Sequence, residues 1–115
     1  MKTFRADLHV HTVLSPCADV EMIPPLIVQQ ALEKKIDIIA ITDHNSSANV
    51  RAVQKAATGT ELTVIPGMEV QSHEDIHLLT LFENVEALDR WQQQVDRSLP
   101  NLPNDVDYFG EQFVV

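Results

Sequence analysis

The architecture is most clearly indicated by Asp37-Ile38-Ile39-Ala40-Ile41-Thr42-Asp43-His44-Asn45. Its centre is an unbroken apolar run, which is typical of a strand that is covered on both faces in a parallel sheet. Polar side chains follow at once, as they do where such a strand ends at the rim of a sheet. This stretch therefore predicts a buried strand over 37–42 that delivers His44 to that rim.

Further apolar runs on both sides predict three more strands, over 4–10, 62–70 and 76–82. Amphipathic segments between and after them predict three helices, of which the first begins near Pro25 and carries two lysines in its last turn. Those lysines are Lys34 and Lys35, and the expected caps of the later helices are Ser46 or Ser47, and Asn84. Strands that alternate with helices predict an α/β fold.

Composition limits the function classes. The chain has 115 residues, which fits one domain but is too short for a complete eight-fold α/β barrel of about 250 residues. Its 17 acidic and 8 basic side chains give a net charge of −9, which excludes a general nucleic-acid surface. No membrane span or leader peptide is expected. A single cysteine, Cys17, favours the reducing cytoplasm.

The last residues, from Phe109 to Val115, include an apolar run. Chain ends are usually polar and frayed, so we expect either that this run docks on the domain or that the natural chain continues. We favour continuation. A third interpretation is that the apolar end is an interface for self-association.

Two histidines end the first predicted strand in Asp7-Leu8-His9-Val10-His11. Strand residues alternate faces, so His9 and His11 share a face and are able to converge on one metal ion. Asp7 is expected on that face as a carboxylate that orients a ligand. Two half-exposed histidines without a metal are the alternative.

Three further side chains are expected at the same rim. His44 is a candidate ligand, and Asp43 either supports a ligand or caps the turn after the strand. Glu69 follows the third strand and is suited to bridge two metals. If the next two strands form a hairpin centred near His73, then Glu69 and His77 lie opposite one another. His73 itself is expected at the exposed tip.

The loop after the first strand offers one more ligand, either Asp19 or Cys17. A lone thiol is more often a small buried group than a ligand. A hard carboxylate also suits a His/Glu site for phosphate chemistry better than a thiol does. We therefore prefer Asp19 as the ligand.

At this point the sequence resembles the PHP family, the polymerase and histidinol phosphatase domain superfamily of metal-dependent phosphoesterases. Four motifs carry the resemblance, in order: Asp7-Leu8-His9-Val10-His11-Thr12, Ile41-Thr42-Asp43-His44-Asn45, Pro66-Gly67-Met68-Glu69-Val70 and Ile76-His77-Leu78-Leu79. The resemblance covers about residues 4–82.

The resemblance implies a distorted (β/α)7 TIM-like barrel that holds two or three divalent ions: Zn, Mn or Fe, with Mg as a further candidate. Hydrolysis of phosphate esters by a metal-bound water is implied, on phosphorylated small molecules, nucleotides or short oligonucleotides. His9 and His11 would be ligands of the first site, Glu69 the bridge and His44 a ligand of the third site. His77 matches a family histidine, and Asp19 or Cys17 fills the remaining place.

The sequence also departs from the family, because members carry further ligands downstream and this chain has no histidine after His77. We therefore interpret residues 1–115 as a partial PHP domain, with the motifs in 4–82 and a helix and apolar tail in 84–115. Activity of this chain alone is expected to be weak. The alternatives are an amidohydrolase-like hydrolase and a non-catalytic metal-binding or assembly module.

Overall fold

The computed structural model describes residues 1–99 and 112–115, and strands alternate with helices along them. The elements are β1 (Ala6–Val10), α1 (Pro24–Glu33), β2 (Ile38–Ile41), α2 (Val50–Ala56), β3 (Thr63–Gln71), β4 (His77–Leu81) and α3 (Val85–Ser98). The α/β prediction is confirmed.

The four strands form one sheet in the order β1-β2-β3-β4. β1, β2 and β3 are parallel, and β4 returns antiparallel to β3. β2 is the apolar run from which the sequence argument began, and Ala40 and Ile41 are fully buried. The carboxyl ends of the parallel strands and the start of β4 therefore meet at one rim.

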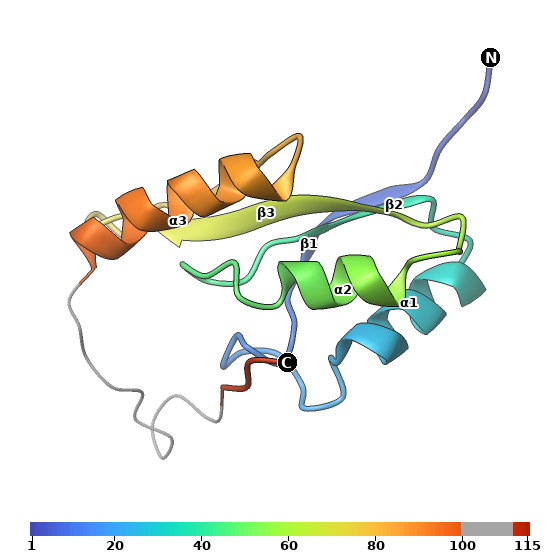
Figure 1. Cartoon of the computed structure of the whole chain (residues 1–115), viewed down its shortest axis with the longest axis horizontal. Coiled ribbons are helices and arrows are strands. Elements are labelled where there is room, and N and C mark those ends of the chain that lie inside the picture. The colour runs from blue at the N-terminus through green and yellow to red at the C-terminus, as the bar shows by residue number, and fades with distance from the viewer. Residues whose placement is uncertain (100–111) are drawn as a thin grey trace.

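The helices enclose a single core. α1 and α2 pack against each other, and α3 lies along β3 (Figure 1). The apolar faces of all three helices join β2 and β3 in one buried cluster, which includes Ile27, Ile39, Val53, Met68 and Leu88. Within the described ranges, no helix combines the length and the apolar content that crossing a lipid bilayer requires.

One of the predicted helix caps is present in the structure and another is not. Asn84 caps α3 as predicted, because its side chain accepts a hydrogen bond from the N–H of Ala87 at 2.9 Å. The cap predicted for α2 is wrong: α2 begins after Asn49, not after Ser46 or Ser47. The chain before Asn49 is held elsewhere, since Gln92 of α3 accepts from the N–H of Ser47 at 2.6 Å.

The predicted positions of two lysines are also wrong. Lys34 is the C-terminal cap of α1, and Lys35 lies beyond it with a φ of 56°. The N–H of Lys35 donates to the carbonyl of Leu32, so the chain leaves the helix in a left-handed turn rather than continuing it.

The β3–β4 hairpin exists, but its register differs from the prediction. Gln71 pairs with His77 and Glu69 pairs with Leu79, so Glu69 and His77 are not directly opposite. The reversal is centred on residue 74, one residue later than expected, and Asp75 in it has a φ of 64°. Glu69 and His77 remain diagonal neighbours on one face, which keeps their side chains within reach. His73 is exposed in the turn, where it was expected.

The described part of the apolar tail docks through its backbone. The N–H of Phe113 donates to the carbonyl of Val13 at 3.3 Å. Asn49 holds the same segment, because its Nδ2 donates to the carbonyl of Phe113 at 2.9 Å and its Oδ1 accepts from the N–H of Val115 at 2.7 Å. The docking that was one of the two expectations for this run is thus present for its backbone. The side chains of the last three residues stay 45–68% exposed.

Candidate metal centre

Backbone pairing at the rim sets two predicted ligands side by side. Beyond β2 the chain stays paired with β3, because the N–H of Glu69 donates to the carbonyl of Asp43 at 3.0 Å and the N–H of Asn45 donates to the carbonyl of Glu69 at 2.9 Å. His44 therefore stands next to Glu69 by sheet geometry. Asn45 adopts a φ of 51°, and its Oδ1 accepts from the N–H of Gln71, which fixes the turn that follows.

Glu69 is the centre of the cluster. Its Oε2 lies 3.0 Å from His11 Nε2, 3.2 Å from His9 Nε2 and 3.4 Å from His44 Nδ1. Its Oε1 lies 3.1 Å from His77 Nδ1. The structure thus gathers four of the five histidines around one carboxylate, whose side chain is only 5% exposed. The cluster thus contains five of the six predicted ligands: His9, His11, His44, Glu69 and His77.

Within the described residues, the Oε2 oxygen of Glu69 lacks a hydrogen-bond partner. Although three ring nitrogens face it, Oε2 is buried and makes no hydrogen bond within the described part of the chain. His9 Nε2 and His11 Nε2 also lie 3.0 Å apart, which leaves room for one proton between them at most. Lone pairs that converge in this way repel one another unless a cation lies between them. The donor set of imidazole and carboxylate fits a divalent metal ion.

Ser15 fixes which nitrogen of His11 is free. Its hydroxyl donates to Asp43 Oδ1 at 2.7 Å and accepts from the N–H of His44 at 3.2 Å. The 3.0 Å contact with His11 Nδ1 must then be donated by the ring, which assigns the proton of His11 to Nδ1. Nε2 of His11 is left as a lone pair that faces Glu69, which is the form that binds a metal.

Asp43 anchors this arrangement from a buried position. Besides Ser15, its carboxylate accepts from the N–H of Thr12 at 2.7 Å and from Thr12 Oγ1 at 2.6 Å. Within the described residues the hydrogen bonds of Asp43 go to Thr12 and Ser15 and not to a histidine ring, so it supports the cluster through Ser15. Asn49, which holds the tail, also donates to Thr12 Oγ1 at 3.1 Å. The docked tail and the ring of His11 therefore belong to one hydrogen-bond network.

The pKa shifts reflect this crowding. Burial raises the pKa of the Glu69 carboxyl, but its interactions with His9 and His77 outweigh burial, so that the pKa ends below its ordinary value. Burial, together with the neighbouring His44, lowers the pKa of His11 and favours its neutral ring. The pKa of His77 is raised by Glu69, which it faces. Partial burial raises the pKa of the Cys17 thiol.

The loop after β1 brings Cys17, and not Asp19, to the cluster. Cys17 Sγ lies 3.5 Å from His44 Nε2 and 4.0 Å from His11 Nδ1. Asp19 lies outside every group of convergent ligand atoms in the described residues. Its carboxylate instead accepts from the N–H of Glu21 at 3.1 Å, in a local turn of the kind that aspartate favours.

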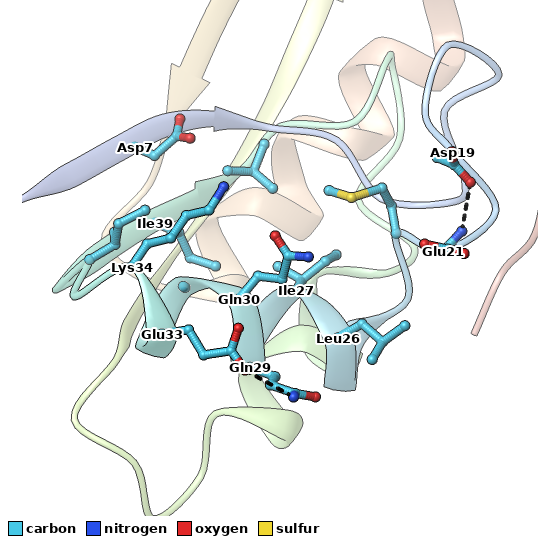
Figure 2. A pocket seen from close by; sticks show the side chains of 14 residues that line it. Asp7, Asp19, Glu21, Leu26, Ile27, Gln29, Gln30, Glu33, Lys34 and Ile39 are labelled. Carbon is cyan, nitrogen blue, oxygen red and sulfur yellow. Dashed lines mark hydrogen bonds between the residues drawn. The ribbon is translucent and has the colours of Figure 1, made fainter.

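Asp7 also lies outside the groups of convergent ligand atoms in the described residues, and its Oδ1 accepts from the backbone N–H of His9 at 3.1 Å. β1 pairs with β2 at Asp7 and again at Val10, and the interval contains one more residue on β1 than on β2. This bulge breaks the alternation on which the prediction rested. Asp7 and Val10 line a cavity of about 520 Å³ between β1 and α1, which Asp19 also lines (Figure 2). Neither Glu69 nor any histidine lines this cavity.

Several supporting residues escaped the sequence argument. Ser15 follows His11 by four residues, but a serine in a loop carries no pattern that links it to a histidine ring. Gln92 of α3 donates to the carbonyl of Asn45 at 3.1 Å, across 47 residues of sequence. Asn49 is fully buried and polar, yet a polar residue before a helix is ordinary. These roles depend on contacts between distant segments.

The sequence profile of the PHP domain matches residues 7–111. The chain belongs to the PHP domain family. This match confirms the resemblance noted above and agrees with the convergence of the motif residues at one rim.

The chain is also similar to individual PHP proteins. It is 34% identical over 80 residues to the 5'-3' exoribonuclease Rnm of Salmonella typhimurium and 32% identical to that of Escherichia coli, over 65% of this chain and 26% of each relative. A crystal structure from Bifidobacterium adolescentis, provisionally described as a metal-dependent phosphoesterase, matches 70% of this chain and 27% of that one. Its TM-score is 0.55 and its identity 27%. The chain therefore spans about a quarter of the length of these proteins.

Proposed function

We propose that this chain carries the first part of the metal centre of a phosphoesterase. The observation that carries the proposal is the buried Oε2 of Glu69, which lacks a hydrogen bond and faces ring nitrogens of His9, His11 and His44. Membership of the PHP family and the similarity to named phosphoesterases support it.

Each protein group has a defined task in this proposal. Glu69 offers its two oxygens to different sets of histidines and is suited to bridge two ions. Ser15 and Asp43 keep the proton of His11 on Nδ1. Three overlapping groups of donors are compatible with two or three divalent ions, for which Zn, Mn and Fe are the candidates and Mg a further one. Bound ions of this kind clamp a phosphate and acidify a water.

The proposed substrates are phosphate esters of nucleotides, short oligonucleotides or small metabolites. The relatives named as 5'-3' exoribonucleases favour the first two. With 8 basic side chains against 17 acidic ones, the chain offers little charge to hold a long nucleic acid. Recognition is therefore expected at the metal centre itself. For the compartment we propose the reducing cytoplasm, in keeping with one free thiol.

The metal proposal is tested by replacing His9 and His11 together by alanine. The purified wild-type chain should take up a divalent metal in stoichiometric amounts, and the double variant should lose that uptake. His73→Ala is the matched control, because this exposed histidine lies outside the cluster. Unchanged metal content in the double variant would contradict the assignment.

Activity is tested with an aryl phosphate and a dinucleotide in the presence of Mn²⁺ or Zn²⁺. We expect weak turnover by this chain, lost in the double variant and much higher in a full-length relative. A small displacement of reacting groups costs about 100-fold in rate, and the longer proteins add groups that fix the substrate. Turnover that matched the full-length relative would show that the later part is dispensable. Turnover of amides but not phosphates would favour the amidohydrolase-like alternative.

A non-catalytic metal-binding or assembly module is the second candidate. The observation in its favour is that the chain spans 26% of the relatives' length, so that a partner or a second copy would have to complete a substrate site. The exposed side chains of Phe113, Val114 and Val115 offer an apolar contact. Stoichiometric metal uptake without hydrolysis, together with a dimeric mass in solution, would support this candidate.

A further inference from the structure

The side chain of Asn49 binds the docked tail, residues 112–115, as one β-strand binds its neighbour. Its Nδ2 donates to the carbonyl of Phe113 at 2.9 Å and its Oδ1 accepts from the N–H of Val115 at 2.7 Å. These two backbone groups flank Val114, and they are the pair that an extended chain offers to a residue on a parallel strand. The amide of Asn49 therefore takes the place of a strand backbone.

The tail satisfies a buried polar group. Asn49 is 0% exposed, and a buried amide needs partners for its donors and its acceptor. Among the described residues, two of its three hydrogen bonds go to the tail, and the third goes to Thr12 Oγ1 at 3.1 Å. The tail lies beside the loop after β1, where the N–H of Phe113 donates to the carbonyl of Val13 (Figure 1). Asn49 is thus paired in full only when the tail is bound.

The direction of these hydrogen bonds fixes the orientation of the amide. A backbone N–H only donates and a carbonyl only accepts, so the tail requires Oδ1 of Asn49 toward Val115 and Nδ2 toward Phe113. The second hydrogen of Nδ2 is then directed at Thr12 Oγ1. With the amide reversed, its oxygen would face the carbonyl of Phe113, and the two oxygens would repel each other.

The orientation of Asn49 is passed on to the metal centre. Because Thr12 Oγ1 accepts from Asn49, its single hydrogen is left for Asp43 Oδ2, which lies 2.6 Å away. Asp43 is 1% exposed and also accepts from the hydroxyl of Ser15, which holds Nδ1 of His11. A series of directed hydrogen bonds therefore connects the backbone of the tail to a ring of the candidate metal centre.

We infer that Asn49 is a positioning residue that couples docking of the tail to metal binding, through Thr12, Asp43 and Ser15. The inference rests on the proposed function and adds a control of metal affinity by a backbone segment that is remote in the sequence. A docked tail keeps the donors to Asp43 in place, which favours the metal-binding form of His11. Coupling between two binding events is reciprocal, so a bound ion must also hold the tail more tightly.

Zinc affinity of the full 115-residue chain, measured by competition with a chelator, tests the first direction of the coupling. Asn49→Ala removes the whole amide, whereas Val115→Pro removes only the N–H that the amide accepts. We expect both variants to bind Zn²⁺ about 2–10-fold more weakly, which is the effect of one lost hydrogen bond. Val115→Ala is the matched control, because it keeps the N–H and shortens a side chain that is 60% exposed. Its zinc affinity should equal that of the wild-type chain.

Hydrogen exchange of the Val115 N–H, measured by NMR with and without Zn²⁺, tests the reverse direction. Zinc should slow this exchange in the wild-type chain by about the same 2–10-fold. In Asn49→Ala the exchange should be fast and should not respond to zinc. A purely structural role of Asn49 would lower the Tm of the variant but would leave the wild-type exchange rate unaffected by zinc.

The outcomes separate this inference from the proposed function. Wild-type zinc affinity in both Asn49→Ala and Val115→Pro would overturn the coupling and leave the His/Glu centre standing. Weaker binding in Asn49→Ala alone, with exchange of the Val115 N–H that ignores zinc, would overturn the role of the tail. The absence of zinc uptake by the wild-type chain would overturn the coupling and the proposed function together.

Discussion

Ser15→Ala removes one hydroxyl oxygen on which three groups depend. The oxygen donates to Asp43, accepts from the N–H of His44 and holds Nδ1 of His11. Its loss leaves a buried backbone donor without a partner and weakens the support of a buried carboxylate. A hydrogen bond to a charged group contributes about 1.5–3 kcal/mol. We expect the free energy of unfolding to fall by about 2 kcal/mol, and the Tm of the metal-free chain by about 10 °C.

Ser15→Ala is also expected to weaken metal binding, and this effect tests the role proposed for the hydroxyl. Without Ser15 the ring of His11 is free to rotate and to carry its proton on Nε2, the nitrogen that faces Glu69. Loss of a group that orients a ligand typically weakens metal binding by about 10–100-fold. Competition of the metal-free chain with a chelator for Zn²⁺ measures this change. Ring ¹⁵N shifts should show the Nδ1–H form of His11 in the wild-type chain and a mixture in the variant.

The matched control is Ser46→Ala, which removes a hydroxyl from the neighbouring loop. Among the residues that the structure describes, Ser46 Oγ accepts a local hydrogen bond from the N–H of Ala48 at 3.3 Å and none from a histidine or from Asp43. Zinc affinity should stay at the wild-type level in this control. If Ser15→Ala lowered the Tm but bound Zn²⁺ as tightly as the wild-type chain, the hydroxyl would serve stability alone and the tautomer argument would be refuted.

Three other predictions concern the scaffold and the pH response. Gly67→Ala should lower the free energy of unfolding in urea by about 1–3 kcal/mol, because a Cβ there would lie 2.9–3.0 Å from carbonyl oxygens of both neighbouring strands. A smaller loss would mean that the neighbouring strands move apart at little cost. Asn84→Ala should cost about 1 kcal/mol by removing the α3 cap, and an unchanged midpoint would contradict this. In NMR titrations of the metal-free chain, His77 should titrate above its ordinary pKa of 6.5 and His11 below it. Stabilisation by His77 should thus be full in acid and be lost as pH rises through its folded pKa; the reverse order of titration would refute it.

The parts of the fold that local patterns encode were predictable. The apolar run of β2 indicated a buried parallel strand, and the residue types at the strand ends pointed to five of the side chains that the structure gathers in one cluster. The carboxyl ends of parallel strands lie at one edge of the sheet. Residues that directly follow such strands in the sequence are therefore predicted to lie close together. The cap at Asn84 was predictable for a similar reason, because it depends only on residues that are adjacent in the sequence.

Two differences from the prediction share a physical origin, because each comes from a one-residue change in strand register. β1 has one more residue than β2 between Asp7 and Val10, and the hairpin is centred one residue later than expected, which moves Glu69 from a direct to a diagonal neighbour of His77. Alternation with period two has no means to foresee such an insertion. Hardness of ligand favoured Asp19, but a local turn decides that Cys17 faces the cluster instead.

The location of the donors along the chain bears on how such a protein is made. The gathered side chains lie between His9 and His77, on β1 to β4 and the turns that join them. In the order of synthesis they all precede α3. A chain that emerges at about 5–20 residues per second then has seconds in which the proposed centre is able to take up ions before α3 is complete. Because metal binding adds directly to folding free energy, ions bound at that stage would stabilise a sheet on which the later part of the chain packs.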